Sequence, residues 1–248
     1  MDDAQLAEEL AERAGALLME LRAGGADGKT GDRRSDEFLL AELAARRPGD
    51  AVLSEESPDP AARHTAERVW IVDPLDGTRE FGEAGRTDWA VHVALWVDGD
   101  LACGAVALPA RGELRSSRTP VGPPPRDGVR RIAVSRTRPP AWAHPVAELV
   151  GAELVGMGSA GAKVDAVLRG EVDAYFHDGG QYEWDSAAPV AVARAAGLHA
   201  SRVDGSALRY NQPDPWAPDL LVCDAGVADR LVGLIGEHRT TTEGAPSR

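Results

Sequence analysis

Two aspartates that follow an apolar stretch are the residues best suited to chemistry in this sequence. Asp73 and Asp76 belong to the string Asp-Pro-Leu-Asp-Gly-Thr, and the apolar residues 70–72 before it predict a buried strand that ends at Asp73. Gly77 and Thr78 then open a predicted helix, whose free N–H groups favour a phosphate. Two carboxylates so close together repel each other unless a cation neutralises them, and Mg²⁺ prefers oxygen ligands. Together these features indicate chemistry on a phosphate ester.

The same string has two other interpretations. An Asp-Pro-x-Asp-Gly string can be a simple turn, in which Asp caps the chain and Gly takes a positive φ. Phosphatases of the haloacid dehalogenase kind use an Asp nucleophile in the string Asp-x-Asp-Gly-Thr, which places its acids two positions apart. Here Asp73 and Asp76 are three positions apart with Pro74 between them, so Asp73 is better placed as a metal ligand than as a nucleophile.

Two further acidic sites lie where an apolar segment meets a loop. Glu55 and Glu56 follow a predicted strand over 51–54, and Asp185 precedes a predicted helix over 186–196. Each site has a structural alternative, because two glutamates can form a solvated loop and an aspartate can simply cap a helix. The ends of adjacent strands converge in α/β proteins, so we expect all these acids to meet at one crevice.

The composition limits the classes of partner. A length of 248 residues and a hydrophobic content of 43% allow one large domain or two lobes with a sizeable core. The net charge of −13 and the pI near 4.9 exclude a nucleic-acid backbone as the partner, because that needs a basic surface. A small anionic phosphorylated substrate is compatible with this charge if metal ions supply local positive charge.

The sequence also predicts a cytoplasmic protein without a membrane partner. No apolar run approaches the ~20 residues that a spanning helix needs, and the first residues lack the basic and apolar regions of a signal peptide. Cys103 and Cys223 have no metal-ligand spacing, and both lie in apolar runs. We therefore expect both cysteines to be small core residues of a reduced protein.

Periodicity and turn signals predict alternating helices and strands in two lobes. Prolines concentrate at 119–128, which we interpret as the linker between an α+β N-terminal lobe over 1–120 and an α/β C-terminal lobe over 128–239, before a disordered tail over 240–248. The first lobe would carry most metal ligands and the second the substrate contacts. Helices are expected over 3–22, 35–46 after a polar loop at 27–32, 142–150, 160–169, 186–196 and 227–238, and strands over 51–54, 70–72, 89–97, 101–108, 131–134, 152–155, 172–176 and 220–223.

Three strings resemble the signatures of the inositol monophosphatase superfamily. They are Asp-Pro-Leu-Asp-Gly-Thr at 73–78, Ser-Glu-Glu-Ser at 54–57 and Trp-Asp-Ser-Ala-Ala-Pro at 184–189. Arg-Glu-Phe at 79–81 and Gly-Ser-Ala-Gly-Ala-Lys at 158–163 are similar to its CysQ-type branch of 3′-phosphoadenosine 5′-phosphate phosphatases. The resemblance spans nearly the whole chain. It implies a layered αβαβα sugar-phosphatase fold and a Mg²⁺-dependent, Li⁺-sensitive phosphatase.

The resemblance also implies which residues hold the metal. Glu55, Asp73 and the Leu75 carbonyl would ligate a first Mg²⁺. Asp73, Asp76 and Asp185 would hold a second Mg²⁺, with Asp73 bridging the two. The number of ions implied is two or three.

Catalytic roles follow from the same resemblance. Thr78 with Glu55 would orient and deprotonate a metal-bound water, while the amides of Gly77 and Thr78 hold the phosphate. One segment departs from the family pattern, because the usual Thr-x-Ala-Asp is replaced by Gly-Asp-Arg-Arg-Ser-Asp at 31–36. We expect Asp36 to occupy the place of the acid that positions the nucleophile or a third metal.

Candidate substrate contacts come mainly from the second lobe. Ser135 and Arg136 follow a predicted strand end, and Lys163 lies in a Gly- and Ser-rich helix start, although it could also be an ordinary surface lysine. The full set of candidates is Gly77, Thr78, Arg79, Ser135, Arg136, Ser159, Lys163 and Glu183. The histidines without ligand spacing are expected to be structural or solvated, namely His64, His92, His144 and His199.

The activity that the resemblance implies is hydrolysis of adenosine 3′,5′-bisphosphate to AMP and phosphate, which would clear a by-product of sulfate assimilation. The same chemistry on inositol monophosphate or fructose 1,6-bisphosphate is the nearest alternative. A catalytically silent protein that binds metabolites is a second alternative. The sequence leaves open whether the protein is a monomer or a homodimer.

Overall fold

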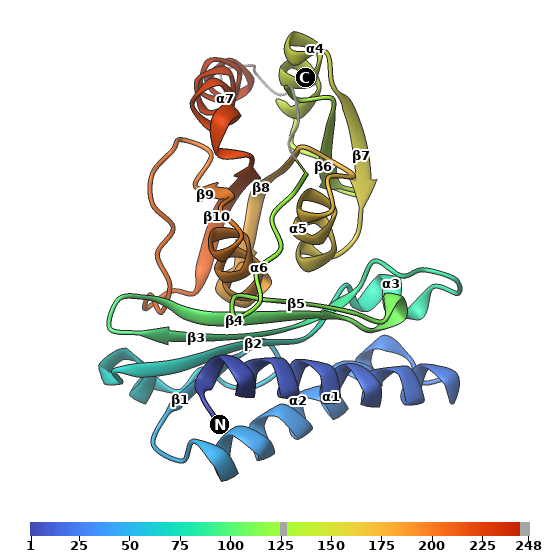
Figure 1. Ribbon diagram of the computed structural model, residues 1–248, viewed down its shortest axis with the longest axis vertical. Coiled ribbons are helices and arrows are strands. Elements are labelled where there is room, and N and C mark those ends of the chain that lie inside the picture. The colour runs from blue at the N-terminus through green and yellow to red at the C-terminus, as the bar shows by residue number, and fades with distance from the viewer. Residues whose placement is uncertain (125–127, 244–248) are drawn as a thin grey trace.

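The computed structural model describes residues 1–124 and 128–243, and it is built of five layers (Figure 1). A pair of helices, a five-stranded sheet, two central helices, a second five-stranded sheet and two outer helices follow one another. This arrangement confirms the predicted αβαβα fold.

The first sheet and its two helices come from the N-terminal part of the chain. Its strand order is β1-β2-β3-β4-β5, in which β1 is parallel to β2 and the remaining strands form an antiparallel meander. A hairpin turn at Asp98-Gly99 joins β3 to β4. The elements are α1 (Asp3–Ala23), α2 (Gly28–Arg46), β1 (Ala51–Ser54), β2 (Arg68–Asp76), β3 (Ala90–Val97), β4 (Asp100–Leu108) and β5 (Glu113–Ser116).

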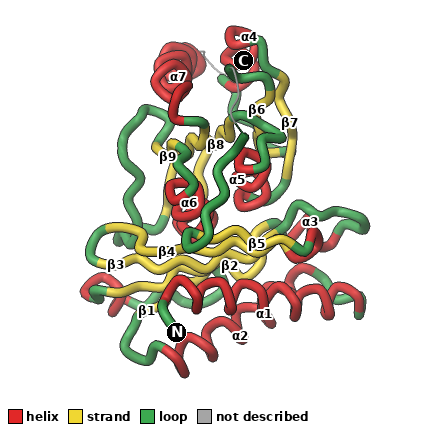
Figure 2. The backbone as a smooth tube through the Cα atoms, in the orientation of Figure 1, coloured by secondary structure: helices red, strands yellow, loops and turns green. Residues whose placement is uncertain are grey.

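The second sheet is mixed. Its order is β7-β6-β8-β10-β9, with β6 parallel to β7 and β8, and β10 antiparallel to both of its neighbours. Helices α5 and α6 lie between the two sheets, and α4 and α7 cover the outer face (Figures 1 and 2). The elements are β6 (Arg131–Ser135), α4 (Ala143–Val150), β7 (Glu153–Met157), α5 (Ala160–Leu168), β8 (Ala174–Tyr182), α6 (Glu183–Ala195), β9 (His199–Ser201), β10 (Trp216–Cys223) and α7 (Ala228–Glu243).

Alternating side chains of each strand enter different cores. In β2, Trp70 enters the core beneath α1 and α2, whereas Ile71 enters the central core around α5 and α6. In β8, Tyr175 points into the central core and Phe176 into the core beneath α4 and α7. Because both faces of each sheet are covered, these strands read as continuous apolar runs in the sequence.

Strand β2 extends beyond its expected end at Asp73. It continues to Asp76, and its register against β3 shifts between these two aspartates. Pro74 lies within the shift, as expected because proline cannot donate a ladder hydrogen bond. Both aspartates therefore lie on strand β2, but the register shift between them makes the spacing of their side chains differ from that in a regular strand.

Helix α2 begins earlier than expected, so the polar loop predicted at 27–32 is wrong. The side chain of Asp27 accepts a hydrogen bond of 2.8 Å from the N–H of Thr30, and the helix starts at Gly28. An N-cap aspartate stabilises a helix start even in a polar, Gly-containing segment. The residues added before the expected start at 35 form about two turns, and they bring Asp32 onto the helix.

The remaining predicted elements are present, most of them with small shifts in their bounds, but β8 runs on to Tyr182 beyond its expected end at 176, and β10 starts at Trp216 rather than at 220. Strands β5 and β9 were not predicted, because Glu-Leu-Arg-Ser and His-Ala-Ser are short and contain only one apolar residue each. Of the predicted linker, 125–127 lie outside the described residues, and the described part passes the end of α6, where a Cβ on Gly122 would lie 3.0 Å from the Ala196 carbonyl oxygen. Of the predicted tail at 240–248, α7 includes the residues up to Glu243, and 244–248 lie outside the described residues.

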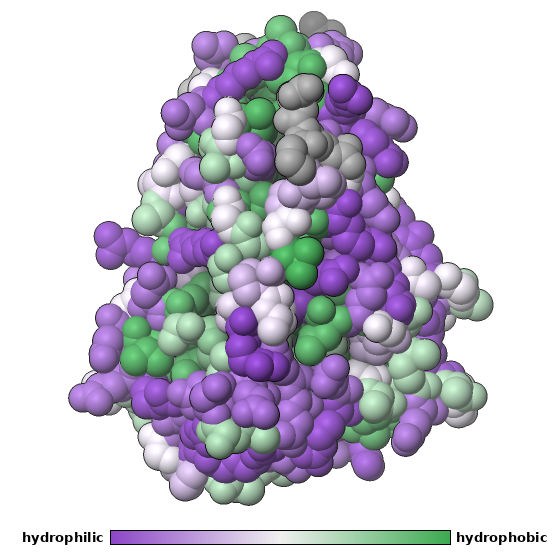
Figure 3. Space-filling model, in the orientation of Figure 1, coloured by the Kyte–Doolittle hydropathy of each residue, from purple (hydrophilic) through white to green (hydrophobic). Residues whose placement is uncertain are grey.

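The surface is largely hydrophilic on the face drawn in Figure 3, where apolar residues form small separate groups. This agrees with the large negative charge of the chain. None of the described helices combines the length and the apolar character needed to cross a bilayer.

Gly104 allows the central helix α6 to approach strand β4, and it provides a test of the packing. A Cβ at Gly104 would lie 2.7 Å from the Ala191 Cβ and 3.1 Å from the Ala188 Cα. We predict that Gly104→Ala lowers the free energy of unfolding by about 1–3 kcal/mol, because a packed helix and sheet cannot separate freely. Urea denaturation measures this. Gly49→Ala is the matched control, since no atom lies within 4 Å of a Cβ there, and equal stability of the two variants would contradict the packing.

Candidate metal centre

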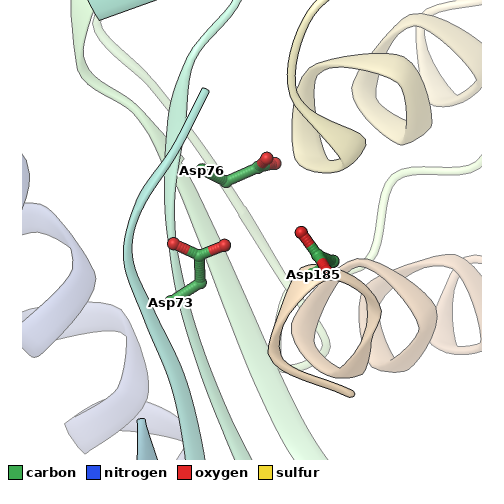
Figure 4. Close-up of side chains that lie close together, drawn as sticks. All are labelled: Asp73, Asp76 and Asp185. Carbon is green, nitrogen blue, oxygen red and sulfur yellow. The ribbon is translucent and has the colours of Figure 1, made fainter. Parts of the chain in front are cut away.

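Three aspartates from two parts of the chain converge between the sheets. Asp73 and Asp76 come from β2, and Asp185 comes from the first turn of α6. One carboxylate oxygen from each lies within 4.8 Å of the others, and Figure 4 shows the three side chains pointing toward a common centre. The structure thus brings together three of the predicted metal ligands.

Local main-chain geometry positions the first two aspartates. The N–H of Leu75 donates to Asp73 Oδ1 at 3.0 Å, and the Ser35 hydroxyl donates to the Pro74 carbonyl at 2.8 Å. Gly77 then turns the chain into the short helix α3 (Thr78–Gly82) with a φ of 93°, where a Cβ would lie 3.2 Å from the Asp88 carbonyl oxygen. Glycine is required there because other residues are strained at positive φ.

Asp76 is the charged member of the cluster. Its Oδ2 accepts hydrogen bonds from the Ser159 hydroxyl at 2.6 Å and from the Gly161 N–H at 2.9 Å, and it lies 3.1 Å from His92 Nε2. Burial opposes ionisation, but His92, Lys163 and these hydrogen bonds lower the pKa of Asp76 to about 2. Asp76 therefore also joins the first sheet to the start of α5.

The buried carboxylate of Asp73 has no comparable groups to stabilise its charge. Its Oδ2 is buried and has no hydrogen-bond partner among the described residues. Burial, and then the charges of Asp76 and Glu55, raise the pKa of Asp73 well above its usual range. Burial and the charge of Asp76 likewise raise the pKa of Asp185 to about 6, although its Oδ2 accepts a 2.6 Å hydrogen bond from the Tyr182 N–H. An orphaned buried oxygen beside two further carboxylates fits a divalent cation with oxygen ligands.

Glu55 and Asp32 surround the cluster. Glu55 lies on the wall of the adjoining cleft, where desolvation and the charges of Asp185 and Asp32 raise its pKa to about 8. Burial raises the pKa of Asp32 to about 7, against the opposing effect of the nearby Thr78 hydroxyl. These two acids are close enough to influence the cluster, but they are not part of the three-aspartate group.

Asp36 was predicted from the sequence to position the nucleophile or a third metal, but its carboxylate is hydrogen-bonded to two serines. Its two oxygens accept hydrogen bonds from Ser54 at 2.5 Å and from Ser57 at 2.7 Å. Asp36 thereby holds the segment that carries Glu55. Asp32, one turn earlier on α2, is the acid that lies beside Thr78. Asp32 precedes Asp36 by one helical turn, and this spacing could have identified it from the sequence. The wrongly predicted loop at 27–32 obscured this relation.

The cluster opens into a cleft of about 740 Å³ that is lined by residues of both sheets. Seven of the predicted substrate contacts line it, namely Gly77, Thr78, Arg79, Ser135, Arg136, Ser159 and Lys163. The cleft also contains Arg138 and the aromatic residues Tyr182 and Trp216, which were not predicted. A cleft that joins acidic groups and several cations is suited to a phosphorylated anion held against a metal.

The cations of the cleft differ in how far they are already paired. Arg136 contacts Glu80 at 2.6 Å and Glu83 at 2.9 Å. Lys163 donates to the Ser159 carbonyl at 2.8 Å. By contrast, the exposed guanidinium groups of Arg79 and Arg138 make no hydrogen bond or ion pair with the described residues. These two arginines are free to meet a ligand.

Glu183, predicted as a substrate contact, does not line the cleft. It is buried, and its oxygens accept hydrogen bonds from the N–H groups of Asn211 at 2.6 Å and Gln212 at 2.8 Å. The fully buried Arg63 donates to the Asn211 side chain at 2.9 Å and to the Gln212 carbonyl at 2.8 Å. This network fixes the start of α6, so Glu183 positions the neighbouring Asp185.

His92 was expected to be structural or solvated, and it has a more specific place. It is fully buried between Asp76 and the Trp184 carbonyl, which lies 3.2 Å from its Nδ1. It also pairs directly with Asp73 in the register of β3 against β2. Strand register cannot be read from one histidine in an apolar run, so no local signal could have identified it.

Comparison with known proteins gives a consistent result. The sequence model of the inositol monophosphatase family matches residues 4–237. A relative from Mycobacterium leprae named 3′-phosphoadenosine 5′-phosphate phosphatase is 53% identical over 256 residues, which cover 96% of this chain and 94% of the relative. The crystal structure of CysQ from Bacteroides thetaiotaomicron, described as a bacterial member of the inositol monophosphatase family, matches with a TM-score of 0.77 at 27% identity, covering 90% of this chain and 97% of that one. Inositol monophosphatase from Anabaena (Nostoc) sp. PCC 7120 has the same fold, with a TM-score of 0.80 at 21% identity over 95% of each chain.

The raised pKa values predict how Mg²⁺ stabilises the protein at different pH. Without metal, the folded protein favours protonated Asp185, Asp32 and Glu55, with pKa values of about 6, 7 and 8, so their contribution to stability is full below about pH 4 and is lost as the pH rises to about 8. Mg²⁺ binds only the charged carboxylates. We therefore predict that a fixed millimolar Mg²⁺ concentration raises the Tm more at pH 8 than at pH 6.

Differential scanning fluorimetry checks this expectation. Asp73→Asn is the control, because the loss of one ligand charge should remove most of the Mg²⁺-dependent shift in Tm at both pH values. An equal or larger shift at pH 6 in the unchanged protein would contradict the assignment of these acids to a metal site.

Proposed function

The chain belongs to the inositol monophosphatase family, and we propose that it is a Mg²⁺-dependent phosphomonoesterase that hydrolyses the 3′-phosphate of adenosine 3′,5′-bisphosphate, giving AMP and phosphate. The observation that carries this proposal is the buried cluster of Asp73, Asp76 and Asp185, which opens into a cleft with unpaired arginines. The choice of substrate is supported by the mycobacterial relative that is named for this activity.

The proposed metal site takes its ligands from the acids described above. Asp73, Asp76 and Asp185 would hold Mg²⁺ together with Glu55 and the Leu75 carbonyl, in a site for two or three ions. Bound divalent ions would polarise a water nucleophile and neutralise charge on the phosphate and its leaving oxygen. No covalent nucleophile is needed for such a transfer, because it depends mainly on positioning and electrostatics.

The protein groups beside the metal site would handle the proton. The Thr78 hydroxyl donates to the Leu75 carbonyl at 3.3 Å, which leaves its lone pairs to accept a hydrogen bond from the attacking water. Asp32 lies next to it with a pKa raised by burial to about 7. An acid in this range is an effective proton acceptor at neutral pH.

The substrate would be held at both of its phosphates. The main-chain N–H groups of Gly77 and Thr78 would contact the phosphate that is removed. The second phosphate would bind Arg79 and Arg138, because their exposed guanidinium groups form no ion pair with the described acids, whereas Arg136 is paired with Glu80 and Glu83. A protein of net charge −13 can bind a bisphosphate in this way since its local cations, not its total charge, face the ligand.

Phosphate release from three compounds tests the proposed activity. We expect Mg²⁺-dependent release from adenosine 3′,5′-bisphosphate with a higher kcat/KM than from inositol 1-phosphate or fructose 1,6-bisphosphate. Asp73→Asn should lower the rate by at least about 10²-fold while keeping the circular dichroism spectrum, because it removes charge stabilisation but little volume. Preference for inositol 1-phosphate would contradict the proposed substrate. Release from none of the three would favour a protein that only binds metabolites.

A pair of matched variants tests which acid of α2 takes part in the reaction. Asp32→Asn should lower kcat by about 10²-fold or more, because it removes a proton acceptor beside Thr78. Asp36→Asn should have a much smaller effect on kcat, since the amide can still bond with Ser54 and Ser57. The kcat of both variants is measured at saturating Mg²⁺ and substrate. A larger loss in Asp36→Asn would support the original assignment of Asp36 and contradict the role of Asp32.

A further inference from the structure

A single histidine interrupts the buried apolar part of strand β3. Residues 90–95 are all fully buried, and His92 is the only polar residue among them. Its neighbours Val91 and Val93 enter the core beneath α1 and α2, so the imidazole points to the opposite face of the sheet. A polar ring in such a place costs free energy unless its nitrogen atoms have polar partners. The partners of His92 therefore indicate its role.

Each ring nitrogen of His92 faces an oxygen atom of a segment that carries the candidate metal centre. Nδ1 lies 3.2 Å from the carbonyl oxygen of Trp184, the residue before Asp185. Nε2 lies 3.1 Å from Asp76 Oδ2, although it forms no well-aligned hydrogen bond with the described residues. Nδ1 is also 4.0 Å from Asp73 Oδ2. One imidazole thus lies beside both aspartates of β2 and beside the main chain that leads to the third.

The first turn of α5 is shaped to approach this imidazole. A Cβ at Gly161 would lie 2.3 Å from His92 Nε2 and 2.9 Å from Val106 Cγ1, so only glycine allows the helix to come this close to the sheet. The N–H of Gly161 donates to Asp76 Oδ2 at 2.9 Å. His92 and the start of α5 therefore contact the same carboxylate oxygen.

These contacts divide the two oxygen atoms of Asp76 between different tasks. Oδ2 accepts hydrogen bonds from the Ser159 hydroxyl at 2.6 Å and from the Gly161 N–H, and it also faces His92 Nε2. The hydrogen bonds that this carboxylate accepts from the described residues all go to Oδ2, which leaves Oδ1 for a cation. Groups that fix one oxygen of a carboxylate set the direction of the other.

We propose that His92 is a positioning residue for the metal centre, which orients Asp76 from β2 and holds the start of α6, and with it Asp185, in the arrangement that Mg²⁺ binding requires. This inference rests on the proposed function and deepens it. His92 is not itself a metal ligand in this arrangement, because both ring nitrogens are directed at oxygen atoms of the protein. Groups that orient metal ligands usually change metal affinity by roughly 10- to 100-fold when they are removed.

Two variants of similar size test the proposal. His92→Leu keeps apolar packing but removes both nitrogen atoms, so we predict that the Kd for Mg²⁺ rises by roughly 10- to 100-fold. His92→Gln has an amide long enough to reach Asp76, so it should recover most of the lost affinity. Isothermal titration calorimetry with Mg²⁺ and the full chain, without substrate, measures the Kd. The Tm in EDTA reports on the fold without metal.

Two further variants separate positioning from folding. Val93→Ala is the matched control, because it removes buried volume from the next residue of β3 on the opposite face of the sheet. It should lower the Tm in EDTA but leave the Kd for Mg²⁺ unchanged. His92→Asn has a shorter amide, which reaches the Trp184 carbonyl but not Asp76, so its Kd should lie above that of His92→Gln. The Asn and Gln pair decides the question even if His92→Leu fails to fold.

The outcomes distinguish this inference from the proposed function. If the unchanged protein releases no phosphate from adenosine 3′,5′-bisphosphate, the proposed function is wrong. If it is active, but the His92 variants bind Mg²⁺ with the Kd of the unchanged protein, the positioning role is wrong and the proposed function stands. If Val93→Ala weakens Mg²⁺ binding as much as the His92 variants do, His92 acts only through stability, and the positioning role is likewise overturned.

Discussion

The structure depends on the crowding of carboxylates between its two sheets. Asp73, Asp76 and Asp185 place oxygens within 4.8 Å of one another, where each charged pair would repel by about 3 kcal/mol at an effective dielectric constant of ~20. Three such pairs sum to about 10 kcal/mol, which is comparable to the whole stability of a typical domain. The protein offsets only part of this cost, since His92 and Lys163 favour the charge of Asp76 while Asp73 Oδ2 has no described partner. A bound divalent cation would supply the rest, so the crowding that is unfavourable without metal would become the means of binding it.

The layers of the fold converge on this cluster. Asp76 accepts hydrogen bonds from Ser159 and Gly161, so an aspartate of the cluster on the first sheet also anchors helix α5, which packs against the second sheet. Glu183 and the fully buried Arg63 fix the start of α6, which carries Asp185. The side chains that line the cleft come from both halves of the chain, because the cleft is bounded by α3 on one side and by the ends of β6, β8 and β10 on the other. A disturbance of either half therefore affects the same site.

Most helices and strands and the three aspartates could be predicted from local signals in the sequence, whereas the layered arrangement was predicted from the resemblance of three strings to a known superfamily. Asp73 and Asp76 stand in one string after an apolar strand, and Asp185 stands at a helix start with its own cap. The residues that were missed depend on packing between distant segments. His92 reaches the cluster through strand register, and Asp32 reaches it through a helix whose cap was interpreted as a loop, whereas Trp216 lines the adjoining cleft beside a cross-strand partner some thirty residues away. Glu183 was assigned to substrate because its neighbours in the sequence are functional, whereas burial directs its side chain to Asn211 and Gln212.

The position of the metal tests the central claim most directly. A crystal of this protein grown with Mn²⁺ in place of Mg²⁺ would show the ion by its anomalous scattering. The account predicts at least one strong peak at bonding distance from carboxylate oxygens of Asp73, Asp76 and Asp185, with Asp73 Oδ2 among the ligands. Well-ordered density for these three side chains without a peak between them, while Mn²⁺ occupies another site, would contradict it.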